Sequence, residues 1–289
     1  MSLPCILDAR RFDAAAHLPF YFGDERVGWI RRADVPLLAR WPDVFTIVDA
    51  GPDAHVALGA GFDNVTARSA ALGSVIGALA AEGRIPGWRN ETYAIRNRFD
   101  APPLAFIERA ASRFFGTMTY AVHLNGVVEY AATAAGKAPQ LWIARRSDTK
   151  ATDPGMLDNV VAGGIGWGLG VEATLAKECW EEAGIAAELA ARATPGRTAH
   201  VLQSLPEGTQ AEQIFVYDLV LPEDFVPHNQ DGEVGEHRLA GIEETARWIE
   251  EGRMTVDASL ATLDLLLRRQ WIDEDACEGI AAIFEPPTL

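Results

Sequence analysis

Positive charge is scarce in this sequence. Of its 289 residues, 25 are Lys or Arg and 41 are Asp or Glu, which gives a formal net charge of −16. A protein that binds nucleic acid through the phosphate backbone needs a basic stripe, so this balance argues against a nucleic-acid partner. A negatively charged substrate would likewise need metal cations or a local basic cluster to offset the acidic field.

Cysteine and long apolar runs are also scarce. The three cysteines, Cys5, Cys179 and Cys277, are widely spaced and predict neither a disulfide framework nor a Cys-x-x-Cys zinc site. No apolar run approaches the roughly 20 residues that span a membrane. The first residues lack the basic start and apolar core of a signal peptide. We therefore expect a cytoplasmic protein with no membrane partner.

Several nucleotide-binding and catalytic motifs are missing. The glycines of the segment 163–170 fit neither G-x-G-x-x-G nor the phosphate-binding G-x-x-x-x-G-K-[ST] pattern in any register. The six histidines are scattered without metal-ligand spacing, and there is no G-x-S-x-G nucleophile motif. Taken alone, the glycine-rich segment indicates a turn-rich loop in which backbone passes close to other groups.

The order of predicted elements indicates two domains. Residues 1–116 show a mixture of short strands and helices, with helices predicted over 65–82 and 103–115. After Gly116, strands interleave with helices, which is typical of a layered α/β domain. Here Gly126 is predicted as a turn between two strands. We expect a smaller α+β domain over 1–116 and an α/β domain over 117–289, packed together because no flexible linker separates them.

A predicted helix near the middle of the chain carries three carboxylates on one face. Glu178, Glu181 and Glu182 are spaced i, i+3 and i+4, so they share one helical stripe. Such a stripe is either a solvated acidic surface or a binding site for a hard divalent cation such as Mg²⁺, which prefers oxygen ligands. The opposite stripe is small and apolar, and includes Cys179, so it can pack against a sheet.

The segment 163–185, GGIGWGLGVEATLAKECWEEAGI, resembles the Nudix box, G-x5-E-x7-R-E-U-x-E-E-x-G-U with U aliphatic. Gly163 matches the first glycine. The end of the box is met at every position if Lys177 replaces Arg and Cys179 serves as U. The early glutamate of the box falls on Leu169, which is a departure from the pattern.

The resemblance implies a fold and a chemistry. The fold is the Nudix α/β/α sandwich with a mixed sheet, and the activity is metal-dependent hydrolysis of a diphosphate in a small molecule. Glu178, Glu181 and Glu182 inherit the role of metal ligands, with Mg²⁺ or else Mn²⁺ as the metal. The loop at Gly163 is expected to bring backbone carbonyls to the metal. Leu169 and Lys177 affect the order of the loop and helix more than metal binding.

Two further motifs resemble one branch of the family. They are W-R-N-E at 88–91 and D-G-E-V at 231–234, and the similarity covers roughly residues 20–285. In some fungi this branch is fused to thiamine pyrophosphokinase. It implies hydrolysis of thiamine diphosphate, and especially of oxidised analogues such as oxythiamine diphosphate, to the monophosphate. We also predict that residues 88–93 of the first domain cover the site.

Candidate residues outside the helix have two readings each. Arg145, Arg146 and Lys150 either receive the diphosphate or pair with nearby aspartates. Trp142 either stacks on a flat heteroaromatic ring or packs in the interior. Glu233 is either a metal ligand or water-activating base, or an exposed loop acid. Glu181 and Glu233 are the candidates for orienting or deprotonating the attacking water.

Two other functions fit the sequence. The same chemistry could act on another nucleoside-diphosphate-linked compound, such as ADP-ribose or a dinucleotide, although no adenine slot is identifiable. Leu169 and Lys177 instead favour a non-catalytic sensor that binds a phosphorylated ligand, whereas the three intact glutamates favour an enzyme. An oligomer is compatible with the sequence, but no feature specifies one.

Overall fold

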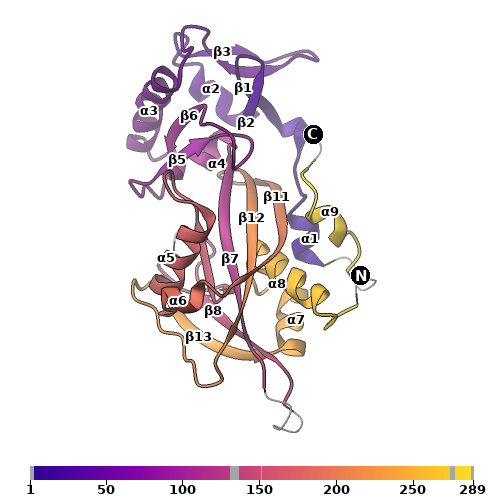
Figure 1. Cartoon of the computed structure of the whole chain (residues 1–289). Coiled ribbons are helices and arrows are strands. Elements are labelled where there is room, and N and C mark those ends of the chain that lie inside the picture. The colour runs from indigo at the N-terminus through magenta and orange to yellow at the C-terminus, as the bar shows by residue number, and fades with distance from the viewer. Residues whose placement is uncertain (1–2, 131–136, 151, 274–276, 288–289) are drawn as a thin grey trace.

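The computed structural model describes residues 3–130, 137–150, 152–273 and 277–287, and its architecture is mixed α/β (Figure 1). A smaller α+β unit precedes a larger unit in which helices flank a mixed sheet. The α/β/α layering expected from the sequence is therefore confirmed.

The smaller unit is built around a mixed four-stranded sheet, an antiparallel pair of strands and one long helix. Its elements after the first helix are η1 (Ala14–Ala16), β1 (His17–Phe22), β2 (Glu25–Arg31), η2 (Arg32–Asp34), α2 (Val35–Leu38), β3 (Phe45–Val48), β4 (His55–Leu58), α3 (Val65–Ala81), β5 (Thr92–Ile95), β6 (Ala105–Glu108), η3 (Arg109–Ala111) and α4 (Ser112–Phe115). One sheet has the order β2-β1-β4-β3, and β5 pairs with β6. Helix α3 begins where the Asn64 side chain accepts a hydrogen bond from the Ala67 amide at 2.9 Å. Its buried face packs into a core that contains Phe20 and Phe115.

The helix predicted over 103–115 is wrong in its first half. Residues 105–108 form strand β6, which pairs with β5 in the register Tyr93↔Ile107. Only the end of the segment turns helical, in η3 and α4, and Gly116 ends it with a φ of +57°. The apolar spacing of this segment fits both structures. The partner strand β5, which supplies the missing backbone hydrogen bonds, decided between them.

The larger unit is organised around a seven-stranded sheet. Its elements are β7 (Met118–Val128), β8 (Gln140–Arg146), β9 (Leu157–Asn159), β10 (Val161–Gly164), α5 (Val171–Ala183), α6 (Ala187–Ala190), β11 (Thr194–Leu205), β12 (Gly208–Leu221), β13 (Val234–Gly241), α7 (Ile242–Glu250), α8 (Val256–Arg268) and α9 (Ile280–Ile283). The order is β11-β12-β7-β8-β13, with β10 on β7 and β9 on β8. The pair β7 and β12 is parallel and the other pairs are antiparallel.

Both faces of this sheet are covered by helices. Helices α5 and α6 lie on one side, and α7 and α8 lie on the other (Figure 1). Successive residues of β7 alternate between the two cores, because side chains of a strand point to opposite faces. Val122 and Leu124 join the core beneath α5, whereas Val127 joins the core beneath α8. This arrangement leaves the strand and helix ends near the smaller unit free to build a site.

The first residues of the chain belong to the core of the larger unit. Helix α1 (Pro4–Asp8) packs beside α8, and Cys5 and Ile6 are buried in the same core as Leu260. The backbone continues along the edge of β11, where the Leu202 amide donates to the Ala9 carbonyl at 2.8 Å. The chain thus crosses from the larger unit into the smaller one and back again.

The turn predicted at Gly126 does not exist. Strand β7 runs unbroken from Met118 to Val128. A β-carbon at Gly126 would lie 2.9 Å from side-chain atoms of both Val160 and Leu221, so the glycine permits close packing inside the sheet. Strand interiors use glycine in this way when other groups approach the backbone closely. The segment between β8 and α5 contains two short strands, β9 and β10.

Candidate active site

Helix α5 carries the three glutamates of the Nudix-like segment. It runs from Val171 to Ala183 and ends at Gly184, whose φ of +64° suits glycine. Leu175, Cys179 and Ala183 are buried against the sheet. The apolar stripe therefore fixes the rotation of the helix about its axis, and this rotation sets the direction of the glutamate stripe.

The ammonium group of Lys177 lies between the carboxylates of Glu178 and Glu181. Its nitrogen is 3.0 Å from Glu178 Oε1 and 2.6 Å from Glu181 Oε2. Burial raises the pKa of the Glu178 carboxyl, although the hydrogen bond and charge of Lys177 oppose this shift. The residue that replaces the arginine of the Nudix box therefore neutralises the carboxylates it precedes.

Glu182 is the most buried of the three, with 5% of its surface exposed. Its Oε2 accepts a hydrogen bond from the Ala162 amide of β10 at 2.8 Å, and Lys150 Nζ lies 3.7 Å from its Oε1. Burial raises the pKa of Glu182 to about 8, against the opposing effects of Lys150 and the Ala162 amide. This carboxylate needs an additional cation to be fully ionised at neutral pH.

Glu233 is held by cations from both units. It forms ion pairs with Lys150 Nζ and, at 3.2 Å, with Arg89 Nη1 of the smaller unit. Burial alone would raise its pKa, but the hydrogen bond and charge of Lys150, together with Arg89, lower it below the ordinary value. Glu233 is therefore ionised at neutral pH. Through Lys150 it is linked to Glu182 on α5.

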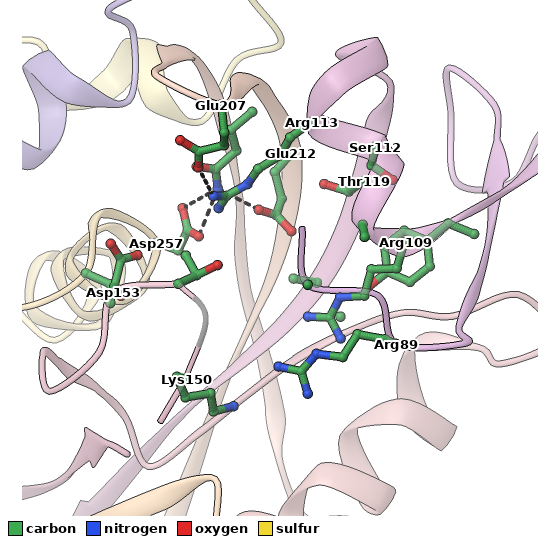
Figure 2. A pocket seen from close by; sticks show the side chains of 18 of the residues that line it. Arg89, Arg109, Ser112, Arg113, Thr119, Lys150, Asp153, Glu207, Glu212 and Asp257 are labelled. Atoms are coloured by element: carbon green, nitrogen blue, oxygen red, sulfur yellow. Dashed lines mark hydrogen bonds and ion pairs between the residues drawn. The ribbon is translucent and has the colours of Figure 1, made fainter. Parts of the chain in front are cut away.

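A cavity of about 450 Å³ lies between the two units, and Lys150 and Glu233 line it, whereas the three glutamates of α5 lie outside its wall. The smaller unit contributes Arg89, Tyr93 and Arg109, and the larger unit contributes Lys150 and Glu233. Figure 2 shows Arg89, Arg109 and Lys150 pointing into this cavity. Further charged and polar residues of the wall are His123, Arg113, Arg146, Asp153, Asp158, Glu207, Gln210, Glu212 and Asp257. The smaller unit thus forms part of the wall, with Arg89 from the segment 88–93.

Two glycines of the glycine-rich segment, Gly163 and Gly164, lie in strand β10 and not in a loop, and they stand where other side chains need the space. A β-carbon at Gly163 would lie 2.3 Å from Glu178 Cγ, and one at Gly164 would lie 2.0 Å from Tyr93 Oη. Beyond them, the Trp167 amide donates to the Thr92 carbonyl at 2.8 Å. Gly163 therefore lets a glutamate of α5 approach the sheet, and the following residues form contacts with the smaller unit.

Replacing Gly164 with Ala is expected to destabilise the protein by about 1–3 kcal/mol, because the new methyl group overlaps Tyr93 Oη. Adding Tyr93→Phe should recover most of the loss, since the next ring atom, Cζ, is 3.3 Å away. Urea unfolding of the single and double variants measures both effects. Gly73→Ala, where no atom lies within 4 Å, is the matched control. Equal unfolding midpoints for wild type and Gly164→Ala would contradict this contact.

Of the other substrate-binding candidates from the sequence, Arg146 reaches the cavity wall, whereas Arg145 and Trp142 do not. Arg145 Nη2 pairs with Asp148 at 2.5 Å, outside the cavity wall. Arg146 reaches the wall, but its Nη1 binds Asp158 at 2.7 Å. Trp142 also lies outside the wall and packs against the core beneath α5. Of the proposed substrate-binding residues, the structure therefore brings Lys150 closest to the glutamates of α5.

The site has the donor chemistry for a divalent cation. As the side chains stand, no group of three His, Cys, Asp or Glu residues converges on a metal position within the described part of the chain. However, Glu178 and Glu181 already converge on one cationic atom, the Lys177 nitrogen. Lys150 approaches the third glutamate in the same way. Carboxylate oxygens that collect around ammonium groups are also the ligands that Mg²⁺ and Mn²⁺ take.

Comparison with known proteins decides the family. Residues 128–258 match the model of the NUDIX domain, and residues 2–119 match that of a domain of unknown function, DUF4743. Nudix hydrolase 24, chloroplastic, of Arabidopsis thaliana is 39% identical over 252 residues, which is 87% of this chain and 67% of that protein. The chain belongs to the Nudix hydrolase family.

Two further proteins are similar to this chain. Nudix hydrolase 20, chloroplastic, of Arabidopsis thaliana is 38% identical over 261 residues, or 88% of this chain and 68% of that protein. An uncharacterized protein of Saccharomyces cerevisiae is 33% identical over 201 residues, or 65% of this chain and 57% of that protein. Nudix enzymes act on small diphosphate compounds and generally use a divalent metal. Within the described residues, no helix is both long and apolar enough to cross a membrane.

Sequence reasoning missed several residues of this site. Arg109, Glu212 and Asp257 line the cavity, yet none of them belongs to a catalytic pattern in the sequence. Arg89 and Tyr93 also line it, and they lie in the segment 88–93 that was predicted to cover the site. The others come from separate elements of both units, so no local spacing relates them. Their common position at a domain interface is a property of the tertiary structure.

Proposed function

We propose that this Nudix hydrolase cleaves the diphosphate of thiamine diphosphate, or of oxidised analogues such as oxythiamine diphosphate, to give the monophosphate, with Mg²⁺ as its metal. One observation carries the proposal. The motifs at 88–91 and 231–234, which resemble the thiamine-associated branch, meet in the cavity through the pair Arg89 and Glu233 at 3.2 Å. These two residues are 144 positions apart in the chain.

The basic side of the cavity supports binding of a diphosphate. Arg89, Arg109 and Lys150 converge there in an otherwise acidic protein. Their present partners are carboxylates: Glu233 for Arg89 and Lys150, and Glu91 for Arg109 at 2.8 Å. Phosphate oxygens accept the same charge-assisted hydrogen bonds as carboxylates. A diphosphate can therefore be received by exchange of these ion pairs.

Glu178, Glu181 and Glu182 would hold Mg²⁺ on the adjoining face of α5, with Mn²⁺ as an alternative and with Gly163 of β10 beside it. When bound, a divalent cation offsets charge on phosphoryl oxygens and lowers the pKa of bound water. The role of the protein is to keep these ligands in place. The Ala162 amide fixes Glu182, and the missing β-carbon at Gly163 gives Glu178 its position.

Glu181 and Glu233 divide the handling of the attacking water. Glu233 has a lowered pKa, which makes it a weak base, so it suits orienting a water proton through Oε1 or Oε2. Glu181 is half-buried, and its carboxylate is hydrogen-bonded only to Lys177 among the described residues. It is the better placed of the two to accept the proton at Oε2 when Lys177 moves away. The water then attacks phosphorus, and the P–O–P bond breaks.

A substrate panel tests this function. Full-length protein is incubated with oxythiamine diphosphate, thiamine diphosphate or ADP-ribose, with Mg²⁺ or with EDTA, and products are separated by chromatography. We expect Mg²⁺-dependent formation of the thiamine-type monophosphates at a kcat/KM at least about tenfold above that for ADP-ribose, a difference of about 1.4 kcal/mol in the barrier. A preference for ADP-ribose would overturn the substrate. Binding of these compounds without turnover would favour a sensor.

A further inference from the structure

One end of the cavity is lined by hydrogen-bond acceptors that the proposed diphosphate chemistry does not use. Glu212 of β12 and Asp257 of α8 lie together there, away from Lys150 and Arg89 (Figure 2). The neighbouring acid, Asp158, is paired with Arg146. An anionic phosphate group is disfavoured beside these carboxylates, so this end of the cavity suits a different part of a substrate.

Glu212 and Asp257 share a single neutral donor. Gln210 Nε2 is 2.7 Å from Glu212 Oε2 and 3.1 Å from Asp257 Oδ2. The nearby cation Arg113 donates its Nη1 to Glu207 at 2.5 Å. Burial raises the pKa of Asp257, and the charge of Glu212 raises it further. The charge of Arg113 lowers the pKa of Asp257 in part, but among the described residues neither carboxylate forms an ion pair. A positive charge placed beside the two carboxylates would relieve their repulsion.

His123 is a further hydrogen-bonding group of the cavity. It is 5% exposed and lines the same cavity. Asn125 Nδ2 donates to Asp218 and to the Ala261 carbonyl, both at 3.0 Å, so Asn125 Oδ1 must accept from Asn159 Nδ2 at 2.9 Å. Asn159 Oδ1 is then left to accept from His123 Nδ1 at 2.8 Å. This network places the proton of the neutral ring on Nδ1.

The hydroxyl of Thr209 is the buried group in this cavity that lacks a partner. Thr209 is 1% exposed and lines the cavity, and its Oγ1 has no hydrogen-bond partner within the described residues. Buried polar atoms are nearly always satisfied, so a polar group of a ligand is the natural complement. With the proton on Nδ1, His123 Nε2 carries a lone pair that can accept a hydrogen bond from the same ligand.

We propose that Glu212, Asp257 and His123 form a subsite for the organic group of the diphosphate substrate, and that this group carries a positive charge and hydrogen-bond donors. The inference rests on the proposed function, which places the diphosphate near Lys150 and Arg89. The two ends of the cavity then recognise the two ends of one bipolar molecule. Glu212 and Asp257 determine specificity, whereas the bond-breaking chemistry stays at α5.

The test compares two diphosphates that differ in the charge of the organic group. Oxythiamine diphosphate carries a thiazolium cation, and methyl diphosphate carries an uncharged group. The ratio of their kcat/KM values is measured with Mg²⁺ for the full chain, for Glu212→Gln and for Asp257→Asn. The ratio does not depend on the fraction of protein that is folded. We expect each variant to lower it at least about tenfold, through a higher KM for the cationic substrate.

Asp153→Asn is the matched control, because Asp153 lies in the same cavity wall and has no ion pair with a described residue. It should change the ratio less than about twofold. An unchanged ratio in Glu212→Gln and Asp257→Asn would overturn the subsite while leaving hydrolysis intact.

Calorimetric titration with thiamine, without metal, separates the two proposals. If the wild type hydrolyses neither diphosphate, the proposed function fails. Weaker thiamine binding in both carboxylate variants than in wild type and Asp153→Asn would still support the subsite. Equal binding by all four proteins would overturn it.

Discussion

Replacing Glu182 with Gln is expected to lower kcat/KM at least about 100-fold at saturating Mg²⁺, because changes even to partners of metal ligands cost roughly 10–100-fold. Gln keeps the shape of the side chain and an oxygen that can accept from the Ala162 amide. It removes the negative charge that a metal ligand supplies. Steady-state kinetics over a Mg²⁺ titration measures the loss. Full activity at saturating Mg²⁺ would contradict the assignment.

The stability of the same variant distinguishes a lost ligand from a damaged fold. The folded-state pKa of Glu182, about 8, is above its ordinary value of 4.5. Its contribution to stability is therefore fully present below pH 4.5 and is lost as pH rises through about 8. Without metal, Glu182→Gln should show a smaller loss of stability than wild type over this range. Glu172→Gln, in the exposed first turn of α5, is the control and should keep wild-type activity.

Replacing Lys150 with Met is expected to lower kcat/KM about 100-fold. Lys150 Nζ contacts Glu233 and lies 3.7 Å from Glu182 Oε1, and its side chain is 11% exposed. Charge-assisted hydrogen bonds contribute about 1.5–3 kcal/mol, which corresponds to roughly 10–100-fold or slightly more. Losing Lys150 removes such a bond to the substrate and leaves two carboxylates without their shared cation. Steady-state kinetics with the preferred diphosphate measures the effect.

Arg145→Met is the matched control for this prediction. Arg145 belongs to the same basic segment of the sequence, but its guanidinium pairs with Asp148 outside the cavity. We expect less than a threefold change, since exposed ion pairs contribute about 0–1 kcal/mol. Equal losses in Lys150→Met and Arg145→Met would show that the segment acts through its overall charge, and would remove the special role given to Lys150.

Local patterns predicted the elements whose partners lie nearby in the chain. The bounds of α5 follow from the glycines that flank it and from its apolar stripe, so the sequence located the helix and its three glutamates. The segment 103–115 shows the limit of such reasoning. Its apolar spacing suits a helix, but β5 offers an unpaired edge, and residues 105–108 became a strand. The turn predicted at Gly126 was wrong for a related reason, since the close packing of Val160 and Leu221 leaves no room for a side chain there.

From the sequence alone follow a Nudix-type helix with three carboxylates on one face, a shortage of basic residues and an N-terminal unit with a motif of its own. Only the tertiary structure shows which side chains lie beside those carboxylates. Lys150 reaches the site and Arg145 does not, although they are five positions apart, because β8 and the loop after it direct their side chains differently. The acceptor end of the cavity is likewise assembled from β7, β12 and α8. Distances between residues on opposite sides of a domain interface cannot be predicted from local sequence spacing, because they depend on how whole sheets and helices pack.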